Sequence, residues 1–406
     1  MKKIIFLSLV FTIFISTTNS YAKNPQKIQI GNHKIFRYEF DLRDSDLILT
    51  KALDSGQLGL ENVLSCSRRH NAKAAFNGSF FHTGYRKTGT PSFLFINTHN
   101  VFALNTIQDA IYRTKKNEVF FEKIKSSISL NLGNEKHIEA SSINNPTISG
   151  IQIYTSCYWT STLSDPNTYE ILVKNNQVIE KSTKGNMKIP KDGFVISANE
   201  DKDIKILRKL KKGDFIKYNL ELSAENKEIN INNISFLISG SNIIVKNAKV
   251  NEEYFVPSYK SDFRDAPHAR TAICQLSKTK FAVFISDHNQ ALKVYDTPLR
   301  EIITPLKKIG LDRETALQTT TGELLEKFNQ IHKNTDLSVG MDLLTFANFL
   351  VSKNCINVIN MDGGGSSTLV VRNKVINNPT GLENINVEGK SLRDVGDIFL
   401  ITKKSK

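Results

Sequence analysis

Three consecutive glycines, Gly363, Gly364 and Gly365, stand between two short β-branched runs near the C-terminal end of the chain. The runs cover residues 355–359 and 368–371, and their length and composition predict two strands. Three glycines cost backbone entropy and add no packing, so they suit a sharp turn where a ligand approaches the main chain. The backbone N–H groups of such a turn form a concavity that fits an anion such as phosphate.

Polar side chains flank these glycines on both sides. Asp362 precedes them and can act as an acid or a base, while Ser366 and Ser367 follow them and can donate hydrogen bonds. No lysine follows the glycines and no long helical pattern begins there, which excludes a P-loop. The alternative interpretation is a glycine-rich hairpin turn with a solvated aspartate.

The N-terminal residues predict export to the periplasm or the medium. Two lysines precede an apolar run, Ile4 to Ile15, and small residues stand at Ser20 and Ala22. This pattern is typical of a secretory signal peptide, residues 1–22, and the run is too short for a transmembrane helix. A retained membrane anchor is the alternative. We find no later run long enough to span a bilayer, so the mature chain is expected to lack a transmembrane segment.

The chain is basic, with a formal net charge of +14 that falls to +12 when the two lysines of residues 1–22 are removed. An exported basic protein suits anionic surroundings such as phosphate-bearing polymers, acidic glycans or a membrane surface. The densest basic cluster, residues 205–212, has the pattern of a solvated face. We find no nucleic-acid-binding motif, and no motif that calls for a cofactor or a metal.

Four cysteines, Cys66, Cys157, Cys274 and Cys355, allow three disulfide pairings outside the cytoplasm. None of their spacings is typical of a metal site. Cys274 and Cys355 each lie in an apolar, strand-like run, so buried thiols are an alternative to a disulfide at these positions.

Most other apolar runs are short, which predicts strands, and helical periodicity is confined to residues 58–70, 299–309 and 342–353. We therefore predict an α+β fold of mixed, mostly antiparallel β-sheets with a few packed helices, the longest near 342–353. The mature chain is expected to form one domain over residues 23–406, with the strands of residues 23–57 either accessory to it or part of it.

Three further predicted strand ends carry polar residues. One strand runs into Asn77 and Gly78, and the Asn77 amide offers both a donor and an acceptor. Arg270 and Thr271 open another apolar run, and an arginine beside a glycine turn can hold a phosphate with two parallel hydrogen bonds. Asp287 follows a third strand as a second carboxylate. The alternatives are strand-ending turns and a surface ion pair.

In order and spacing, these motifs together resemble the phosphodiester glycosidase family, the domains of the N-acetylglucosamine-1-phosphodiester alpha-N-acetylglucosaminidase type and of exported bacterial relatives. The resemblance spans roughly residues 60–402, and its stretches are Asn77-Gly78-Ser79-Phe80-Phe81, His268-Ala269-Arg270-Thr271-Ala272, Asn360-Met361-Asp362-Gly363-Gly364-Gly365-Ser366-Ser367, and Asn378-Pro379 with Arg393. Gly240, between two apolar runs, resembles the glycine of a further family segment. The chain departs from the family pattern at Ser79, at His288-Asn289 and at Leu392, where the family usually has Gly, Gly-Arg and Glu.

The resemblance implies a hydrolase that cleaves the bond between a sugar's anomeric carbon and a phosphodiester oxygen. The substrate would be a GlcNAc-1-phosphodiester or a phosphate-bearing envelope glycan, and no cofactor is required. The leaving phosphate monoester is a stable anion, but a carboxylate must still activate water or form a glycosyl intermediate. Asp362 is the first candidate and Asp287 the second. The residues expected to bind substrate are Asn77, Gly78, Gly240, Arg270, Thr271, Gly363, Gly364, Gly365, Ser366, Ser367 and Arg393.

Other function classes remain as alternatives. A non-catalytic module that binds phosphorylated or anionic glycans is favoured by the basic charge and by Leu392 in place of the family acid. A serine hydrolase is disfavoured because the chain lacks a Gly-x-Ser-x-Gly elbow. A structural β-protein would not bring Asn77, Arg270 and Asp362 together, so their placement in the fold separates these readings.

Overall fold

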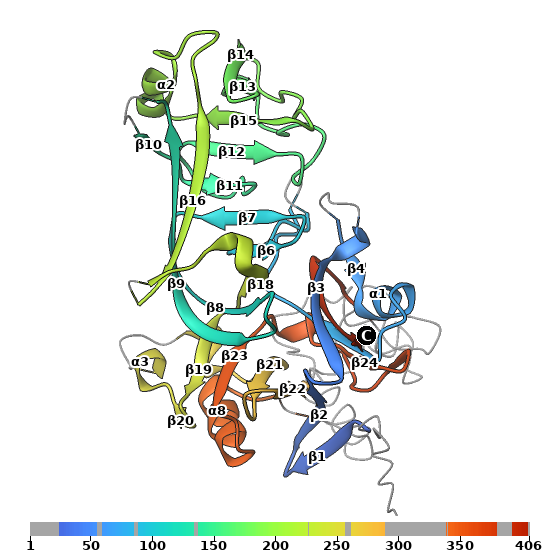
Figure 1. The fold of residues 1–406 in the computed structure, drawn as a ribbon. Helices are drawn as coiled ribbons and strands as arrows, with labels where there is room; N and C mark the ends of the chain where they lie inside the picture. The colour runs from blue at the N-terminus through green and yellow to red at the C-terminus, as the bar shows by residue number, and fades with distance from the viewer. Residues whose placement is uncertain are drawn as a thin grey trace, which may run out of the picture.

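The computed structural model describes residues 24–54, 59–84, 88–133, 137–225, 227–255, 261–288, 338, 340–379 and 392–404. The predicted signal peptide and the predicted helix at 299–309 lie outside these ranges. Strands dominate the described chain and form two mid-sized sheets and one long sheet (Figure 1).

The first mid-sized sheet has seven strands in the order β1-β2-β22-β21-β23-β19-β20. Every neighbouring pair in it is antiparallel. The strands are β1 (Gln26–Ile30), β2 (His33–Asp41), β22 (Lys280–Ser286), β21 (Arg270–Gln275), β23 (Asn357–Asn360), β19 (Asn242–Lys246) and β20 (Lys249–Val250).

The second mid-sized sheet has five strands in the order β25-β24-β5-β27-β3, again antiparallel throughout. The strands are β25 (Lys374–Val375), β24 (Leu369–Val371), β5 (Ala74–Asn77), β27 (Asp397–Lys403) and β3 (Ser45–Lys51). A separate two-stranded ladder joins β26 (Asp394–Val395) to β4 (Glu61–Asn62).

The long sheet has thirteen strands and extends away from the other two as an arm (Figure 1). Its order is β14-β13-β15-β12-β11-β7-β6-β18-β8-β9-β16-β17, with β10 also paired to β9. Only β11 and β12 run parallel. The strands are β6 (Phe95–Asn97), β7 (Val101–Leu104), β8 (Thr106–Thr114), β9 (Val119–Asn131), β10 (His137–Glu139), β11 (Ser142–Ile143), β12 (Gln152–Thr155), β13 (Tyr169–Lys174), β14 (Gln177–Ser182), β15 (Gly193–Ala198), β16 (Lys217–Ala224), β17 (Lys227–Glu228) and β18 (Ile234–Ser239).

The described helices are short and lie around the sheets. They are α1 (Val63–Arg69), α2 (Asp201–Leu207), α3 (Glu252–Phe255), α4 (Asp262–Asp265) and α8 (Leu343–Ser352), with 3-10 turns η1 (Ala52–Asp54), η2 (Ile231–Asn233) and η3 (Gly364–Ser366). The side chain of Asp342 caps α8 by accepting from Thr345 N. The predicted α+β class and the helix near 342–353 are confirmed. None of the described helices combines the length and apolarity that crossing a bilayer requires.

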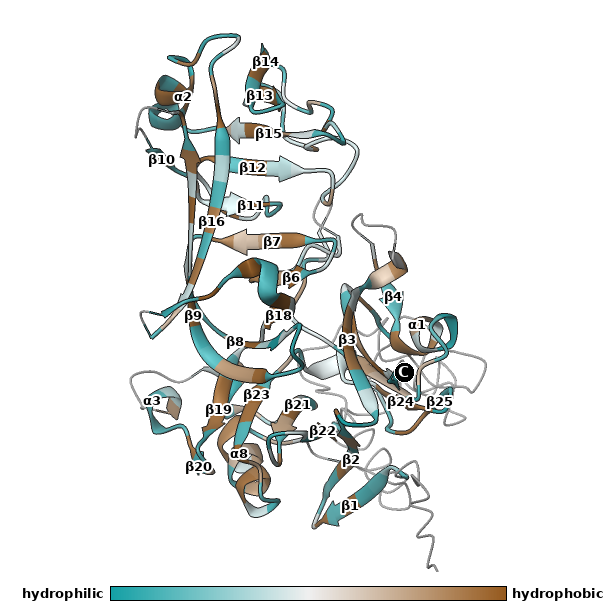
Figure 2. Ribbon diagram, in the orientation of Figure 1, coloured by the Kyte–Doolittle hydropathy of each residue, from teal (hydrophilic) through white to brown (hydrophobic). Residues whose placement is uncertain are grey.

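The apolar side chains divide among several buried clusters. One cluster joins residues of the seven-stranded sheet, the five-stranded sheet and the adjoining part of the arm, and in it Phe76 and Phe399 of the five-stranded sheet stack with ring centroids 5.0 Å apart. Another lies along the arm, and a third packs α8 against the seven-stranded sheet. In Figure 2 the hydrophobic residues gather on strands such as β7 and β19, while the edge strand β1 is largely hydrophilic.

The seven-stranded sheet is tied to the end of α8 by a disulfide between Cys274 and Cys355. The bridge joins two fully buried cysteines, so the alternative of buried free thiols at this pair is wrong. Cys66 and Cys157 are outside any disulfide.

Candidate functional site

The triple-glycine turn lies where the chain passes from β23 in the seven-stranded sheet to β24 in the five-stranded sheet. The arm reaches the same region, because Gly240 lies where β18 of the arm passes to β19 of the seven-stranded sheet. Asn77 ends β5 and Arg270 begins β21, in the strands that flank this turn. The predicted strand ends therefore meet where the three sheets meet.

Asn77 joins two of the predicted motifs. Its side-chain Nδ2 donates to the backbone oxygen of Asp362 at 2.8 Å, and its Oδ1 accepts from the Thr271 hydroxyl at 2.9 Å. The same Oδ1 lies 3.3 Å from the backbone nitrogen of Thr368. The Thr271 hydroxyl is also 3.1 Å from the Ser367 hydroxyl. The Asn77 side chain thus fixes the turn by binding the backbone of Asp362. Both ends of its side-chain amide are already hydrogen-bonded within the protein.

Asp287 belongs to the same buried network. Its two carboxylate oxygens accept from Asn377 Nδ2 and from the backbone nitrogen of Asn378, each at 2.8 Å. Asn377 Nδ2 also donates to the Ser367 oxygen at 2.9 Å. Only 2% of Asp287 is exposed, so this carboxylate fixes the segment after β25 to the end of β22. This geometry favours a structural role for Asp287, whereas the sequence predicted that Asp287 contacts the substrate directly.

Asp362 is the half-buried carboxylate at the mouth of the turn. Its backbone N–H donates to the Gly78 oxygen at 3.1 Å, and its Oδ1 accepts from Gly363 N at 2.8 Å. Burial raises the pKa of Asp362 to about 6, against the opposing effects of Ser366, the Gly363 N–H and the positive charge of Arg393. A carboxylate with a pKa near neutrality is suited to proton transfer.

A third aspartate, Asp397, lies beside Asp362 and was not among the predicted site residues. It is fully buried, and its Oδ1 accepts from the backbone nitrogen of Ser79 at 2.7 Å. Burial and the nearby charge of Asp362 raise the pKa of Asp397 to about 7, while the Ser79 N–H and Lys51 oppose this shift. A Cβ built on Gly78 would lie 1.8 Å from Asp397 Oδ1, so glycine is required at position 78.

Lys51 completes this buried group of charges. It stands opposite Asp397 in the pairing of β3 with β27, and only 1% of it is exposed. Its ammonium nitrogen lies 4.5 Å from the centroid of the Phe102 ring and has no hydrogen-bond partner among the described residues. Burial lowers the pKa of Lys51 to about 8, against the opposing effect of Asp397. Lys51 and Asp397 are therefore two buried ionisable groups on paired strands, and the charge of each shifts the pKa of the other.

Arg270 is placed differently from the prediction. Its Nε donates to the Met341 oxygen at 2.9 Å, and its Nη2 donates to the oxygens of Phe263 and Ala266 at 2.7 and 2.9 Å. Only Nη1 makes no hydrogen bond in the described structure, and the side chain is 1% exposed. Burial lowers the pKa of Arg270 to about 10. The prediction that Arg270 binds phosphate through two parallel hydrogen bonds is corrected. Its Nε and Nη2 groups instead bind backbone oxygens of the α4 region and of the segment before α8.

Strand alternation explains the placement of Arg270. Successive residues of a strand point to opposite faces. Thr271 points toward Asn77 and the five-stranded sheet, whereas Ala272, which shares the face of Arg270, packs under α8. The side chains of Arg270 and Thr271, both predicted to bind substrate, therefore lie on opposite faces of β21.

The predicted anion cradle is partly closed. Gly363 N donates to the Asp362 carboxylate, and Gly364 N donates to the Ala269 oxygen at 2.9 Å. Two of the three glycine N–H groups are thus already committed to the protein. Gly364 has a φ of +58°, a conformation that favours glycine.

Gly240 and Ser241 attach the arm to the turn. Ser241 N donates to the Asn360 oxygen at 2.8 Å, and Asn360 Nδ2 donates to the Ser241 hydroxyl at 2.8 Å. A cavity of about 430 Å³ opens beside them, with Phe93 and Tyr254 among its lining side chains. Asn360 is two residues before Asp362, so its hydrogen bond to Ser241 links the lining of this cavity to the turn, although Asp362 itself does not line the cavity.

The last predicted site residue, Arg393, is half-buried, and its positive charge lowers the pKa of Asp362. The preceding Leu392 is 1% exposed and packs with the residues of α1, such as Val63. An apolar side chain therefore fills the position where the family usually has an acid. Within the described ranges, no group of three or more His, Cys, Asp or Glu side chains is placed to hold a metal ion.

The family model of phosphodiester glycosidases matches residues 328–402 of this chain, which confirms the predicted resemblance over that segment. No curated protein matches the chain. Two solved structures share its fold at 16% identity. A hypothetical protein from Synechocystis gives a TM-score of 0.68 and covers 94% of this chain, which spans 61% of that protein. This chain therefore spans less than two thirds of the length of that protein.

The second structure, a protein from Burkholderia pseudomallei described as exported, gives a TM-score of 0.65, with 91% of this chain and 74% of that chain covered. The catalytic domain of zebrafish N-acetylglucosamine-1-phosphodiester alpha-N-acetylglucosaminidase, auto-inhibited by its pro-peptide, gives a TM-score of 0.43 at 14% identity. The match covers 94% of this chain and 82% of the zebrafish chain. At such identities the likenesses to the Synechocystis and Burkholderia structures concern the fold alone.

Proposed function

Because residues 328–402 match the phosphodiester glycosidase family, we propose that this chain is an exported hydrolase of sugar-1-phosphodiesters. It would cleave the bond between the anomeric carbon and the phosphodiester oxygen, in a GlcNAc-1-phosphodiester or in a phosphate-bearing envelope glycan. The observation that carries the proposal is the convergence of Asn77, Thr271 and Asp362 in one hydrogen-bonded network.

Asp362 is the catalytic carboxylate in this proposal. Of the three aspartates in the region it alone is partly exposed, whereas Asp287 is 2% exposed and Asp397 is fully buried. A base must reach the water or sugar on which it acts. Asp287 then belongs to the framework, and Asp397 acts as a positioning residue through Gly78 and Ser79.

The reaction needs one proton transfer. Water attacks the anomeric carbon, and Asp362 takes a proton from that water. The bond from the anomeric carbon to the phosphate oxygen breaks, and its electron pair leaves with the phosphate monoester. Because that leaving group is already a stable anion, protonation by a second carboxylic acid is not required.

The remaining groups suit binding of the two halves of the substrate. The cavity beside Gly240 offers the rings of Phe93 and Tyr254 to a sugar, together with amide side chains. The half-buried Arg393, whose charge reaches Asp362, is the cation we assign to the phosphate in place of Arg270. The turn contributes Ser366, which faces the Asp362 carboxyl.

Solvent labelling tests which bond is cleaved. The purified mature chain is incubated with a panel of sugar-1-phosphodiesters in water enriched in oxygen-18, and the products are analysed by mass spectrometry. The proposal predicts a phosphate monoester without label and a sugar that carries the label at its anomeric oxygen. Label in the phosphate together with release of the alcohol would identify an ordinary phosphodiesterase and overturn the proposal.

A non-catalytic module that binds anionic glycans is the second candidate. It is favoured by Leu392 at the position of the family acid, and by the carbonyl partners of Arg270. It predicts saturable binding of phosphorylated glycans with no turnover on the same panel. Measuring binding and product formation in parallel separates the two functions.

We assign residues 1–22 to a signal peptide that directs the chain out of the cytoplasm. The Burkholderia pseudomallei protein whose fold this chain shares is described as exported, which supports this assignment. N-terminal sequencing of protein recovered from the periplasm or medium should begin at Lys23, and a mature chain that begins at Met1 would contradict export by cleavage.

A further inference from the structure

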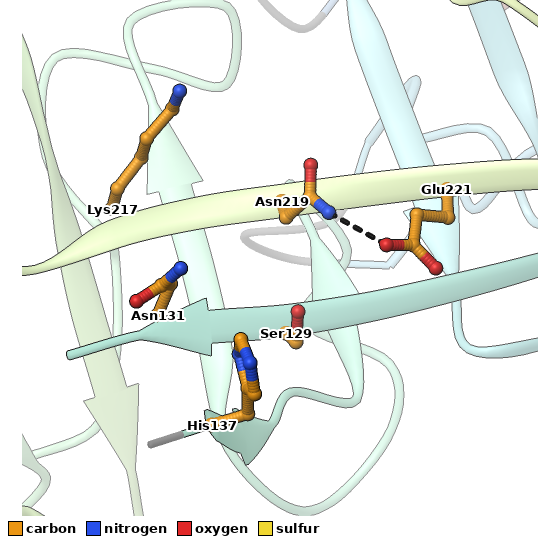
Figure 3. A pocket seen from close by; sticks show the side chains of 6 residues that line it. All are labelled: Ser129, Asn131, His137, Lys217, Asn219 and Glu221. Carbon is orange, nitrogen blue, oxygen red and sulfur yellow. Dashed lines mark hydrogen bonds between the residues drawn. The ribbon is translucent and has the colours of Figure 1, made fainter. Parts of the chain in front are cut away.

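A second cavity, of about 470 Å³, lies on the arm and is separate from the candidate site (Figure 3). Polar side chains of three strands line it, namely Ser129 and Asn131 on β9, His137 on β10, and Lys217, Asn219 and Glu221 on β16. We call this cavity the arm groove. Asn219 donates to the Glu221 carboxylate at 2.9 Å. In the part of the chain that the structure describes, Ser129, His137 and Lys217 make no side-chain hydrogen bond or ion pair.

The pairing of β9 with β16 places these side chains on one face. Lys217 stands opposite Asn131, and Asn219 stands opposite Ser129. The intervening Tyr218 points to the other side, where its ring meets Phe194 edge to face in the core of the arm. The groove is therefore built on the outward face of a sheet whose inner face is fully packed.

An exposed aromatic ring extends this row. Phe215 stands two residues before Lys217, and the alternation continues because the intervening Ile216 is fully buried. Phe215 is 46% exposed and lies at the end of β9, where its Cδ1 is 3.8 Å from an ideal Cβ on Gly133. A ring beside amides and hydroxyls is the combination that binds the apolar face and the hydroxyl groups of a sugar.

The end of the arm also concentrates positive charge. Residues 174–217 contain twelve lysines and arginines against six acids, which gives six of the fourteen net charges of the whole chain. Exposed cations precede β16 in the chain, namely Lys205, Arg208, Lys209, Lys211 and Lys212. Figure 1 shows α2, β13 and β14 gathered at this end. Such a concentration attracts anions and raises their local concentration.

We propose that the arm groove binds a phosphate-bearing oligosaccharide. Phe215 would stack on a sugar ring, Asn131 and Ser129 would bind hydroxyl groups, and Lys217 would pair with phosphate. A recessed groove with an aromatic end fits a glycan chain better than the flat surface of an anionic bilayer. Binding at the arm groove requires no hydrolysis, so this proposal can be tested independently of the proposed hydrolase activity.

Binding by the full mature chain tests this site. Titration calorimetry is run with phosphorylated dextran, plain dextran, inorganic polyphosphate and phosphatidylglycerol vesicles. We expect phosphorylated dextran to bind tightest, with an affinity that falls as salt rises. Phe215→Ser and Lys217→Gln should each weaken binding by about tenfold, a change of 1.4 kcal/mol.

Two variants serve as matched controls. Leu344→Ser removes an apolar side chain with the same exposed fraction, 46%, from α8. Lys125→Gln removes a cation from β9, further along the strand from the groove. Both should bind like the wild type. Equal affinity for polyphosphate, tighter binding to vesicles, no loss in the Phe215 and Lys217 variants, or an equal loss in the controls would each overturn the proposal.

Discussion

Asp362 and Asp397 are joined through a single residue. The backbone N–H of Asp362 donates to the Gly78 oxygen, and the Gly78 N–H donates to the Asp397 oxygen, both at 3.1 Å. The two carboxyl groups are close enough that the charge of Asp362 raises the pKa of Asp397. The strand end at Asn77 and Gly78 therefore sets the geometry of a carboxylate pair built from distant parts of the chain.

The first prediction concerns the pH dependence of hydrolysis. If Asp362 is the base, kcat/KM should be constant above its pKa of about 6 and fall about tenfold per pH unit below it. Because the pKa of Asp397 is about 7, its carboxyl is largely protonated at the pH where Asp362 titrates, so Asp397→Asn should leave the midpoint of the acid limb near pH 6.

Asp192→Asn, on the exposed surface of the arm, is the control and should leave the acid limb unchanged. A midpoint of the Asp397 variant well below that of the wild type would show that Asp397 is charged when Asp362 titrates, and would contradict this order of the two pKa values.

The second prediction concerns stability. The pKa of Asp362 is raised from 3.8 to about 6 on folding, so the folded state holds more protons between these values. The wild type should therefore lose stability as pH rises from about 4 to about 6. Asp362→Asn lacks this loss and should be more stable at pH 8, by about 1–2 kcal/mol after allowance for its partial exposure.

Thermal denaturation at pH 4 and pH 8 measures this effect. The advantage of Asp362→Asn should shrink at pH 4, where the wild-type carboxyl is protonated in the folded state. A variant that is less stable than the wild type at pH 8 would show that the carboxylate is not penalised by burial.

The third prediction concerns Gly78. A Cβ at this position would lie 1.8 Å from Asp397 Oδ1, so Gly78→Ala must displace a buried carboxylate and should cost about 1–3 kcal/mol. Gly84→Ala is the matched control, because no atom lies within 4 Å of its added Cβ, and it should change stability by less than about 0.5 kcal/mol. Similar melting temperatures for the two variants would mean that Asp397 can move freely.

The fourth prediction concerns the disulfide between Cys274 and Cys355, which are 81 residues apart in the sequence. Closing a loop of this length should stabilise the folded chain by about 4 kcal/mol. The double variant Cys274→Ala, Cys355→Ala should therefore melt well below the wild type, whereas Cys157→Ser should not. Equal melting temperatures for the double variant and the wild type would show that the bridge contributes nothing.

The predictable part of the fold is local. Apolar helical spacing over residues 342–353 predicted α8, and short β-branched runs predicted most strands around the candidate site. The convergence of Asn77 and Asp362 also followed from their positions at strand ends. What the sequence could not supply was the order of strands, so the thirteen-stranded arm was not anticipated.

The errors at the site have physical causes. Arg270 and Thr271 were both expected to face the substrate, but neighbouring residues of a strand point to opposite faces. Asp397 was missed because its significance depends on the pairing of β27 with β3, which places Lys51 opposite it. That pairing joins residues from opposite ends of the chain, and no local pattern specifies it.

The most direct measurement compares sugar release from a GlcNAc-1-phosphodiester by the wild type and by Asp362→Asn, with folding of both checked by their melting curves. We predict turnover by the wild type and a fall in kcat of at least about a hundredfold in the variant, the size expected when a general base is lost. Hydrolysis by a folded Asp362→Asn at the wild-type rate would contradict the account.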